Sequence, residues 1–198
     1  MSNEILSETY VQFTLQLKTR GLYDREPVYG VGPERARIML IGEAPGETEE
    51  KQGQPFVGKA GKNLDQFLDI VGLNRDEIFI TNAVKFRPVK PGKRPGTFVN
   101  RTPDKAELQV CSELLRQELR LVQPEYVVTL GNTALRAVVG DKSMTIGNVH
   151  GCLTHIAGSC CEFMLFPLYH PASVIYRREL LTTYMEDIAK LALIVNKN

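Results

Sequence analysis

Three polar side chains come directly after short apolar runs, where a buried strand would end: Glu43, Asn82 and His170. A carboxylate at the end of a buried strand is costly unless it is hydrogen-bonded or functional. An amide offers a donor and an acceptor side by side, which suits the carbonyl and imide N–H edge of a pyrimidine. Each residue also has a structural explanation, because Glu43 could cap a helix, Asn82 could close a turn, and a lone histidine is usually structural.

Loops rich in glycine and proline accompany these residues. Gly42–Gly46 and Gln54–Gly58 have the composition of shaped loops whose backbone N–H groups can face a ligand. Phe56 lies in the second loop rather than on an amphipathic face. Most such phenylalanines cover a core, and the functional alternative is a platform on which a base stacks.

Apolar runs alternate with helical patterns along the chain. Strands are expected at 37–41, 78–81, 126–130 and 163–168, and helices at 62–71, from 102–104 to about 122, from 131 onward, and at about 179–195. Pro103 is expected at the first helical position, and residues 145–156 are expected to form a hairpin or extended meander. The alternation predicts a three-layer α/β/α sandwich with a mostly parallel central sheet, in one domain spanning 1–198. Active sites in such folds lie beyond the carboxyl ends of the strands, where Glu43, Asn82 and His170 would meet.

The segment after His170 combines an apolar step with two cations. Val174, Ile175 and Tyr176 precede Arg177 and Arg178. This pattern is typical of a wedge into a duplex whose flanking cations grip phosphates, although it also fits the first turn of the last helix.

Charge and cysteine content narrow the class of protein. The net charge is only +1, but six basic residues and no acidic one occupy the segment 85–101: Lys85, Arg87, Lys90, Lys93, Arg94 and Arg101. This cluster could neutralise phosphates or form a solvated loop. The four cysteines form no CxxC pair, so we expect reduced, largely buried thiols and no metal site. No apolar stretch is long enough for a membrane span and no secretory signal is visible, which favours a cytoplasmic protein.

Five motifs in order give the chain a resemblance to the uracil-DNA glycosylase superfamily, and most closely to its family 4. They are GEAPG at 42–46, QPFVGKAG at 54–61, TNAVKFRP at 81–88, TLGNTAL at 129–135 and LYHPASVIYR at 168–177. The resemblance implies a glycosylase that excises uracil from DNA, with no membrane partner; we expect a monomer, the default for an enzyme that slides along DNA.

The resemblance also implies a role for each residue of the motifs. Glu43 would position or activate the attacking water, and the backbone at Ala44 would help to hold the base. Phe56 would stack on the flipped uracil, Asn82 would read its edge, and His170 would donate to uracil O2. The expected DNA contacts are Lys62, Asn63, Asn132 and Thr133 at helix N-termini, and Ser173, Val174, Ile175, Tyr176 and Arg177 beside the gap left by the flipped nucleotide.

The chain departs from family 4 in its cysteines. That family carries four cysteines that bind an iron–sulfur cluster, two of them in an N-terminal CxxC. Here the N-terminal region has no cysteine, Phe86 occupies the third position, and only Cys111 matches a ligand. One thiolate cannot hold such a cluster, so we expect none. The 89–100 loop is also longer than usual.

Three other functions stay open at this point. A non-catalytic module of the same fold would bind DNA or a partner and be indifferent to substitution of His170. A glycosylase for another deaminated base, such as hypoxanthine or xanthine, would differ in what Asn82 reads. A nucleotide-binding α/β protein is disfavoured, because neither GKS/T nor GxGxxG occurs.

Overall fold

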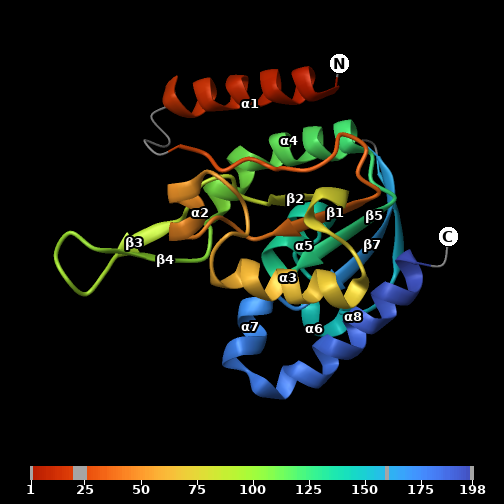
Figure 1. The fold of residues 1–198 in the computed structure, drawn as a ribbon. Helices are drawn as coiled ribbons and strands as arrows, with labels where there is room; N and C mark the ends of the chain where they lie inside the picture. The colour runs from red at the N-terminus through yellow and green to blue at the C-terminus, as the bar shows by residue number, and fades with distance from the viewer. Residues whose placement is uncertain (1, 20–25, 159–160, 197–198) are drawn as a thin grey trace.

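The computed structural model describes residues 2–19, 26–158 and 161–196, and its centre is a five-stranded sheet (Figure 1). The strand order is β2-β1-β5-β7-β6. The strands are β1 Ile38–Gly42, β2 Ile78–Asn82, β5 Tyr126–Leu130, β6 Thr154–Ala157 and β7 Glu162–Leu168. All pairings are parallel except that of β6 with β7. The parallel strands therefore end at one common edge.

Side chains of each strand alternate between two apolar layers, as the pleat requires. In β1, Ile38 and Leu40 belong to the core under helices α3 (Lys59–Val71), α7 (Pro171–Tyr176) and α8 (Leu181–Val195). Met39 and Ile41 belong to the core under helices α4 (Lys105–Val122) and α5 (Gly131–Val139). Both faces of the sheet are thus covered by helices. The predicted three-layer α/β/α sandwich with a mostly parallel sheet is confirmed.

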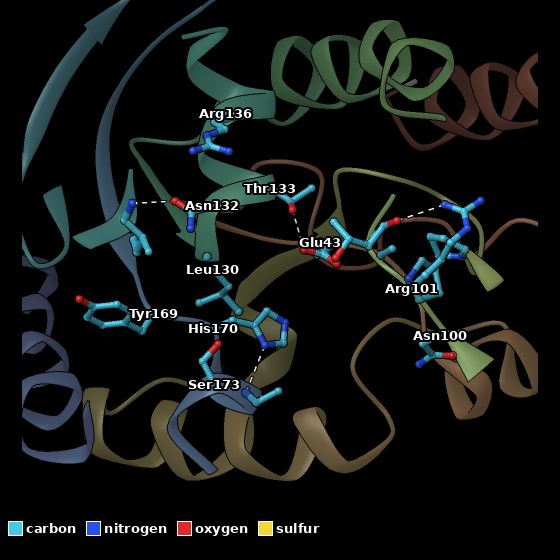
Figure 2. A pocket seen from close by; sticks show the side chains of 17 residues that line it. Glu43, Asn100, Arg101, Leu130, Asn132, Thr133, Arg136, Tyr169, His170 and Ser173 are labelled. Atoms are coloured by element: carbon cyan, nitrogen blue, oxygen red, sulfur yellow. Dashed lines mark hydrogen bonds between the residues drawn. The ribbon is translucent and has the colours of Figure 1, made fainter. Parts of the chain in front are cut away.

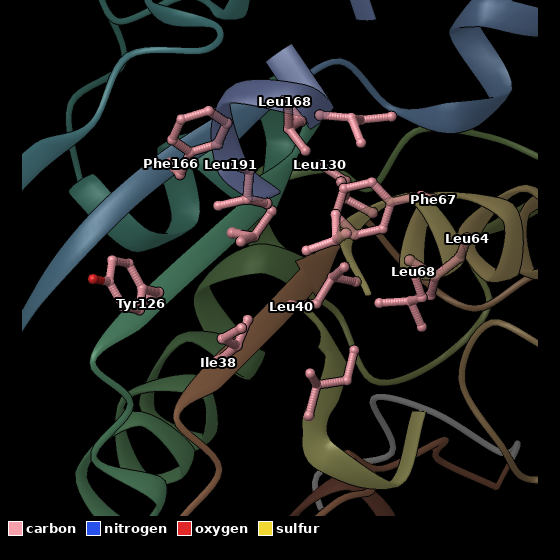
Figure 3. Packing of buried hydrophobic residues seen from close by; sticks show 14 of the residues in the cluster. Ile38, Leu40, Leu64, Phe67, Leu68, Tyr126, Leu130, Phe166, Leu168 and Leu191 are labelled. Atoms are coloured by element: carbon pink, nitrogen blue, oxygen red, sulfur yellow. The ribbon is translucent and has the colours of Figure 1, made fainter. Parts of the chain in front are cut away.

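The first layer consists of α3 Lys59–Val71, α7 Pro171–Tyr176 and α8 Leu181–Val195. Leu64, Phe67 and Leu68 of α3 point at the strand side chains (Figure 3). Helix α3 begins three residues earlier than expected, and it ends where Gly72 adopts φ 77°. A left-handed conformation of this kind costs glycine little and ends many helices.

The opposite layer contains α4 Lys105–Val122 and α5 Gly131–Val139, with α1 Ser2–Thr19 packed outside α4. Asp104 caps α4, because its Oδ1 accepts from the N–H of Glu107 at 3.0 Å. Pro103 therefore precedes the cap, and its expected place at the first helical position was wrong. Helix α1 was not foreseen, although Leu6, Phe13 and Leu17 form its buried stripe.

The remaining elements are short. They are α2 Glu47–Gln52, η1 Arg75–Glu77, β3 Val89–Pro91, β4 Phe98–Asn100, α6 Ile146–Val149 and η2 Arg178–Leu180. The expected meander at 145–156 thus contains the four-residue helix α6 before β6 begins at Thr154. The expected last helix starts later, at Leu181, after the separate elements α7 and η2. Among the described residues, no helix has the length and apolar character needed to cross a membrane.

Candidate active site

A cleft opens at the carboxyl edge of the sheet, as the fold predicts. It comprises two adjoining cavities of about 550 and 470 Å³. Ala44, Asn100, His170 and Ala172 line both cavities. The larger cavity also contains Glu43 (Figure 2). The smaller one is lined by Phe56 and Asn82. The cleft therefore brings together the five residues that the sequence analysis expected to act on the base: Glu43, Ala44, Phe56, Asn82 and His170.

Asn82 and Phe56 meet at the floor of the smaller cavity. A Cβ added at Gly42 would overlap both Oδ1 of Asn82 and Cζ of Phe56, so only glycine permits this approach. Asn82 is 2% exposed, and within the described residues its side-chain amide makes no hydrogen bond. The amide therefore keeps a donor and an acceptor for a ligand.

Phe56 is held in an unusual backbone conformation. Its φ is 55°, in the left-handed region that non-glycine residues rarely adopt. The Arg75 guanidinium donates to the Phe56 carbonyl at 2.6 Å, and Gly61 leaves room for that carbonyl. Strain of this kind persists only where surrounding contacts impose it, and it concentrates at functional sites. The arrangement fixes the Phe56 ring, whose centroid lies 6.4 Å from that of His170.

His170 precedes α7 as its N-cap. Its Nδ1 accepts a hydrogen bond from the backbone N–H of Ala172 at 3.1 Å. A ring nitrogen that accepts carries no proton, so the neutral imidazole must be protonated at Nε2. Burial lowers the pKa of His170 from its ordinary value near 6.5 to about 4. The side chain is therefore a neutral donor through Nε2–H at physiological pH.

Glu43 is oriented by a residue from a different strand end. The Thr133 hydroxyl, in the first turn of α5, donates to Glu43 Oε2 at 2.6 Å (Figure 2). The sequence predicted Thr133 only as a phosphate contact. Its neighbour Asn132 accepts from the N–H of Ile146 at 2.8 Å and so fastens α6 to the cleft. Both residues line the larger cavity, where phosphate contact stays a prediction.

A second carboxylate, which the sequence analysis missed, joins the two glycine-rich loops. Glu49 is 8% exposed, and it accepts from the N–H of Gly58 at 2.6 Å and of Gly46 at 3.1 Å. A Cβ at either glycine would collide with the Glu49 carboxylate. The only signal for Glu49 in the sequence was an acidic residue six positions after Glu43, within a run of acidic residues typical of a solvent-exposed surface.

A buried ion pair supports β2 from behind the cleft. Lys85 and Glu118 are both fully buried, with Nζ and Oε2 2.6 Å apart. Lys85 also donates to the Asn82 carbonyl at 2.6 Å and to the Thr81 hydroxyl at 2.7 Å. Tyr10 of α1 donates to Glu118 at 2.9 Å, and burial raises the pKa of Tyr10, so this hydroxyl stays protonated. The network therefore anchors the strand end that carries Asn82.

Lys62 and Asn63 are not among the residues that line either cavity of the cleft, and their contact with DNA stays a prediction. Because α3 begins at Lys59, the N–H of Lys62 already bonds the carbonyl of Gly58 at 3.2 Å. Their backbone is therefore not the free N-terminus that we expected. Asn63 instead lines a groove between α3 and α8.

The segment after His170 fits the expected wedge only in part. Ser173 lines the larger cavity. Val174 is 9% exposed and packs in the core under α3, so it would have to leave that core to enter a duplex, and its wedge role stays a prediction. The Ile175 and Tyr176 side chains lie outside the described part of the structure, and exposed Arg177 pairs with Glu179 at 3.3 Å.

The residues near Cys111 do not fit an iron–sulfur cluster. Cys111 is buried among apolar side chains that include Phe13, Leu17 and Phe86, and its sulfur accepts from the N–H of Lys85 at 3.5 Å. Burial raises the pKa of the Cys111 thiol to about 11, whereas a cluster requires thiolates. Within 2–19, 26–158 and 161–196, no three His, Cys, Asp or Glu side chains are grouped to hold a metal.

Known proteins with similar sequences indicate the family of this chain. The profile of the Uracil DNA glycosylase superfamily matches residues 29–191. A type-4 uracil-DNA glycosylase of Sulfurisphaera tokodaii is 39% identical over 168 residues, covering 83% of this chain and 72% of that protein. One from Archaeoglobus fulgidus is 35% identical, covering 86% and 82%. A type-5 enzyme of Pyrobaculum aerophilum is 34% identical, covering 76% and 67%. The chain belongs to the uracil-DNA glycosylase superfamily.

Proposed function

We propose that this protein hydrolyses the N-glycosidic bond of uracil in DNA and leaves an abasic site, the first step of base excision repair. The observation that carries the proposal is the meeting of Asn82, Phe56, His170 and Glu43 in one cleft, with the Asn82 amide unoccupied by the described residues. A base in a duplex is out of reach, so the nucleotide must be flipped into this cleft.

Each side chain of the site then acts on a particular part of the flipped nucleotide or on the attacking water. Asn82 pairs with the imide N–H and the adjacent carbonyl, and Phe56 stacks on the ring. As the bond between C1′ and N1 breaks, its electron pair moves to the uracil, and His170 Nε2–H donates to O2. Glu43, which is held by Thr133, orients a water molecule. The water oxygen bonds to C1′, and the Glu43 carboxylate accepts the proton that the water loses. A positioned donor to a developing anion is worth about 3–4 kcal/mol of the barrier.

The same geometry supports the choice of base. Cytosine presents the reverse donor and acceptor order to the Asn82 amide, and an edge mismatch leaves buried polar groups unpaired. The methyl group of thymine would have to fit against the fixed Phe56 ring. We further propose that residues 1–198 act as one domain, as a cytoplasmic monomer, and without an iron–sulfur cluster; iron and acid-labile sulfide in the purified protein would contradict the last point.

The test uses a labelled oligonucleotide with one uracil, incubated with the protein and then cleaved by alkali at abasic sites. Wild type should produce the shorter strand, and His170→Ala should be slower by roughly 100- to 1,000-fold. His155→Ala is the matched control, because His155 is exposed on β6 and lines neither cavity. The absence of cleavage at uracil in both single- and double-stranded DNA would refute the proposal. Cleavage at hypoxanthine alone would indicate a glycosylase for that base instead.

A further inference from the structure

The six basic residues between 85 and 101 differ in burial and in ion pairing. Lys85 is buried against Glu118, as described above. Arg87 pairs with Glu50 at 3.2 Å, and Arg101 forms a two-pronged pair with Glu107 at 2.7 Å. The other three are exposed: Lys90, Lys93 and Arg94.

The two paired arginines fix the base of a β-ribbon formed by β3 and β4. Arg87 Nε donates to Asn100 Oδ1 at 2.6 Å, and Arg101 Nε donates to the Val89 carbonyl at 3.0 Å. Asn100 faces Val89 in the ladder and also lines both cavities of the cleft. The ribbon is therefore attached at the rim of the site, from which it projects (Figure 1).

A tight turn closes the far end of the ribbon. The Thr97 N–H bonds the Arg94 carbonyl at 3.1 Å, and Gly96 has φ 74° after Pro95, as in a type II turn. The strand advances about 10 Å from Asn100 to Thr97, the axial length of about three nucleotides of one DNA strand. The tip would therefore be within reach of DNA that flanks a nucleotide held in the cleft.

The exposed cations suit a phosphate backbone. No ion pair or side-chain hydrogen bond engages Lys90, Lys93 or Arg94 within the described ranges. No acidic residue occurs between Arg87 and Arg101 to compete for them. Phe98, 50% exposed, lies two residues from Asn100 and hence on the same face of β4, where a base or sugar would meet an aromatic ring.

We propose that the β3–β4 ribbon is a DNA-binding arm, in which Lys90, Lys93 and Arg94 neutralise phosphates beside the flipped nucleotide and Phe98 contacts the adjoining nucleotide. This inference rests on the proposed function for its choice of DNA. It adds a contact surface made by the long 89–100 segment, independent of the residues that act on uracil.

The test measures binding to a labelled, uracil-free duplex from about 50 to 200 mM KCl. Each phosphate neutralised contributes about 0.9 to the slope of log K against log salt, so three contribute about 2.7. A variant with Gln at 90, 93 and 94 should therefore have a shallower slope, and wild type should lose about 40-fold more affinity over this fourfold salt range. Phe98→Ala should weaken binding roughly tenfold and leave the slope unchanged.

Two control variants keep the result specific. Replacing Arg35, Arg116 and Arg120 by Gln removes the same charge, but these residues lie toward the amino ends of the strands, before β1 and in the second half of α4. That variant should keep the wild-type slope. Exchanging Lys and Arg at 90, 93 and 94 should also keep it, and equal thermal melting shows that the proteins are folded.

The outcomes separate this proposal from the function on which it rests. A wild-type slope in the Gln variant, with wild type excising uracil, overturns the arm and leaves the proposed function standing. An equal loss of slope in the Arg35, Arg116 and Arg120 variant also overturns it, since net charge would then explain the effect. A shallower slope only in the ribbon variant supports the arm, even if no uracil is excised and the proposed function fails.

Discussion

Lys85→Met should be among the most damaging single substitutions in this protein. It leaves the Glu118 carboxylate fully buried without its cation, and among the described residues the Tyr10 and Thr81 hydroxyls alone would still donate to it. Removal of one partner of a buried ion pair costs about 3–5 kcal/mol. Since domains are stable by about 5–15 kcal/mol, a large part of the folding free energy would be lost.

The double variant Lys85→Met, Glu118→Met should be far less damaging than the sum of the two single variants. Apolar replacement of both charges removes the desolvation cost, and the two hydroxyls left without an acceptor cost about 1 kcal/mol each. Two single variants that each cost about 4 kcal/mol and a double variant that costs about 2 kcal/mol give a coupling of about 6 kcal/mol. The folded double variant should also excise uracil more slowly, because the Asn82 carbonyl has lost its donor.

Urea unfolding of the four proteins measures this coupling. Arg116→Met is the control, because its ion pair with Glu113 is half exposed and should contribute less than about 1 kcal/mol. Additive single effects would refute the idea of an interdependent pair. A loss below about 1 kcal/mol in Lys85→Met would show that Glu118 finds another partner.

Three further predictions concern the cleft. Gly42→Ala should abolish excision because its methyl overlaps Phe56, whereas Gly147→Ala, which meets open space, should be active in the same single-turnover assay. Thr133→Val should lower kcat roughly tenfold with little change in KM, because Glu43 loses its orienting hydrogen bond; an unchanged kcat would contradict this. The pKa of His170 is about 4 in the folded protein and near 6.5 in the unfolded chain. Between pH 6.5 and pH 4, therefore, the imidazole binds a proton only in the unfolded state. Stability should therefore fall by up to about 3 kcal/mol as pH drops from 6.5 to 4, and urea titrations of a His170→Gln variant should lack this contribution.

Much of the site could be predicted because the strands are short, apolar and parallel. Apolar runs indicate buried strands, and alternation with helices makes the strands parallel, so their carboxyl ends share an edge. Glu43, Asn82 and His170 follow such runs, and the structure brings them into one cleft. Apolar periodicity and the residues at helix ends also located most helices, because both are properties of residues that are close together in the sequence.

What only the tertiary structure decided is which partner each polar group meets. The basic cluster read as one feature, yet Lys85 is buried, Arg87 and Arg101 are paired, and the rest is exposed. The Nε2–H tautomer of His170 is set by a backbone contact of 3.1 Å. Ion pairs and caps form between residues far apart in the chain, and a side chain's type and its neighbours in sequence do not specify them. The sequence determined where the chemistry would gather, and packing determined which charges stay free to perform it.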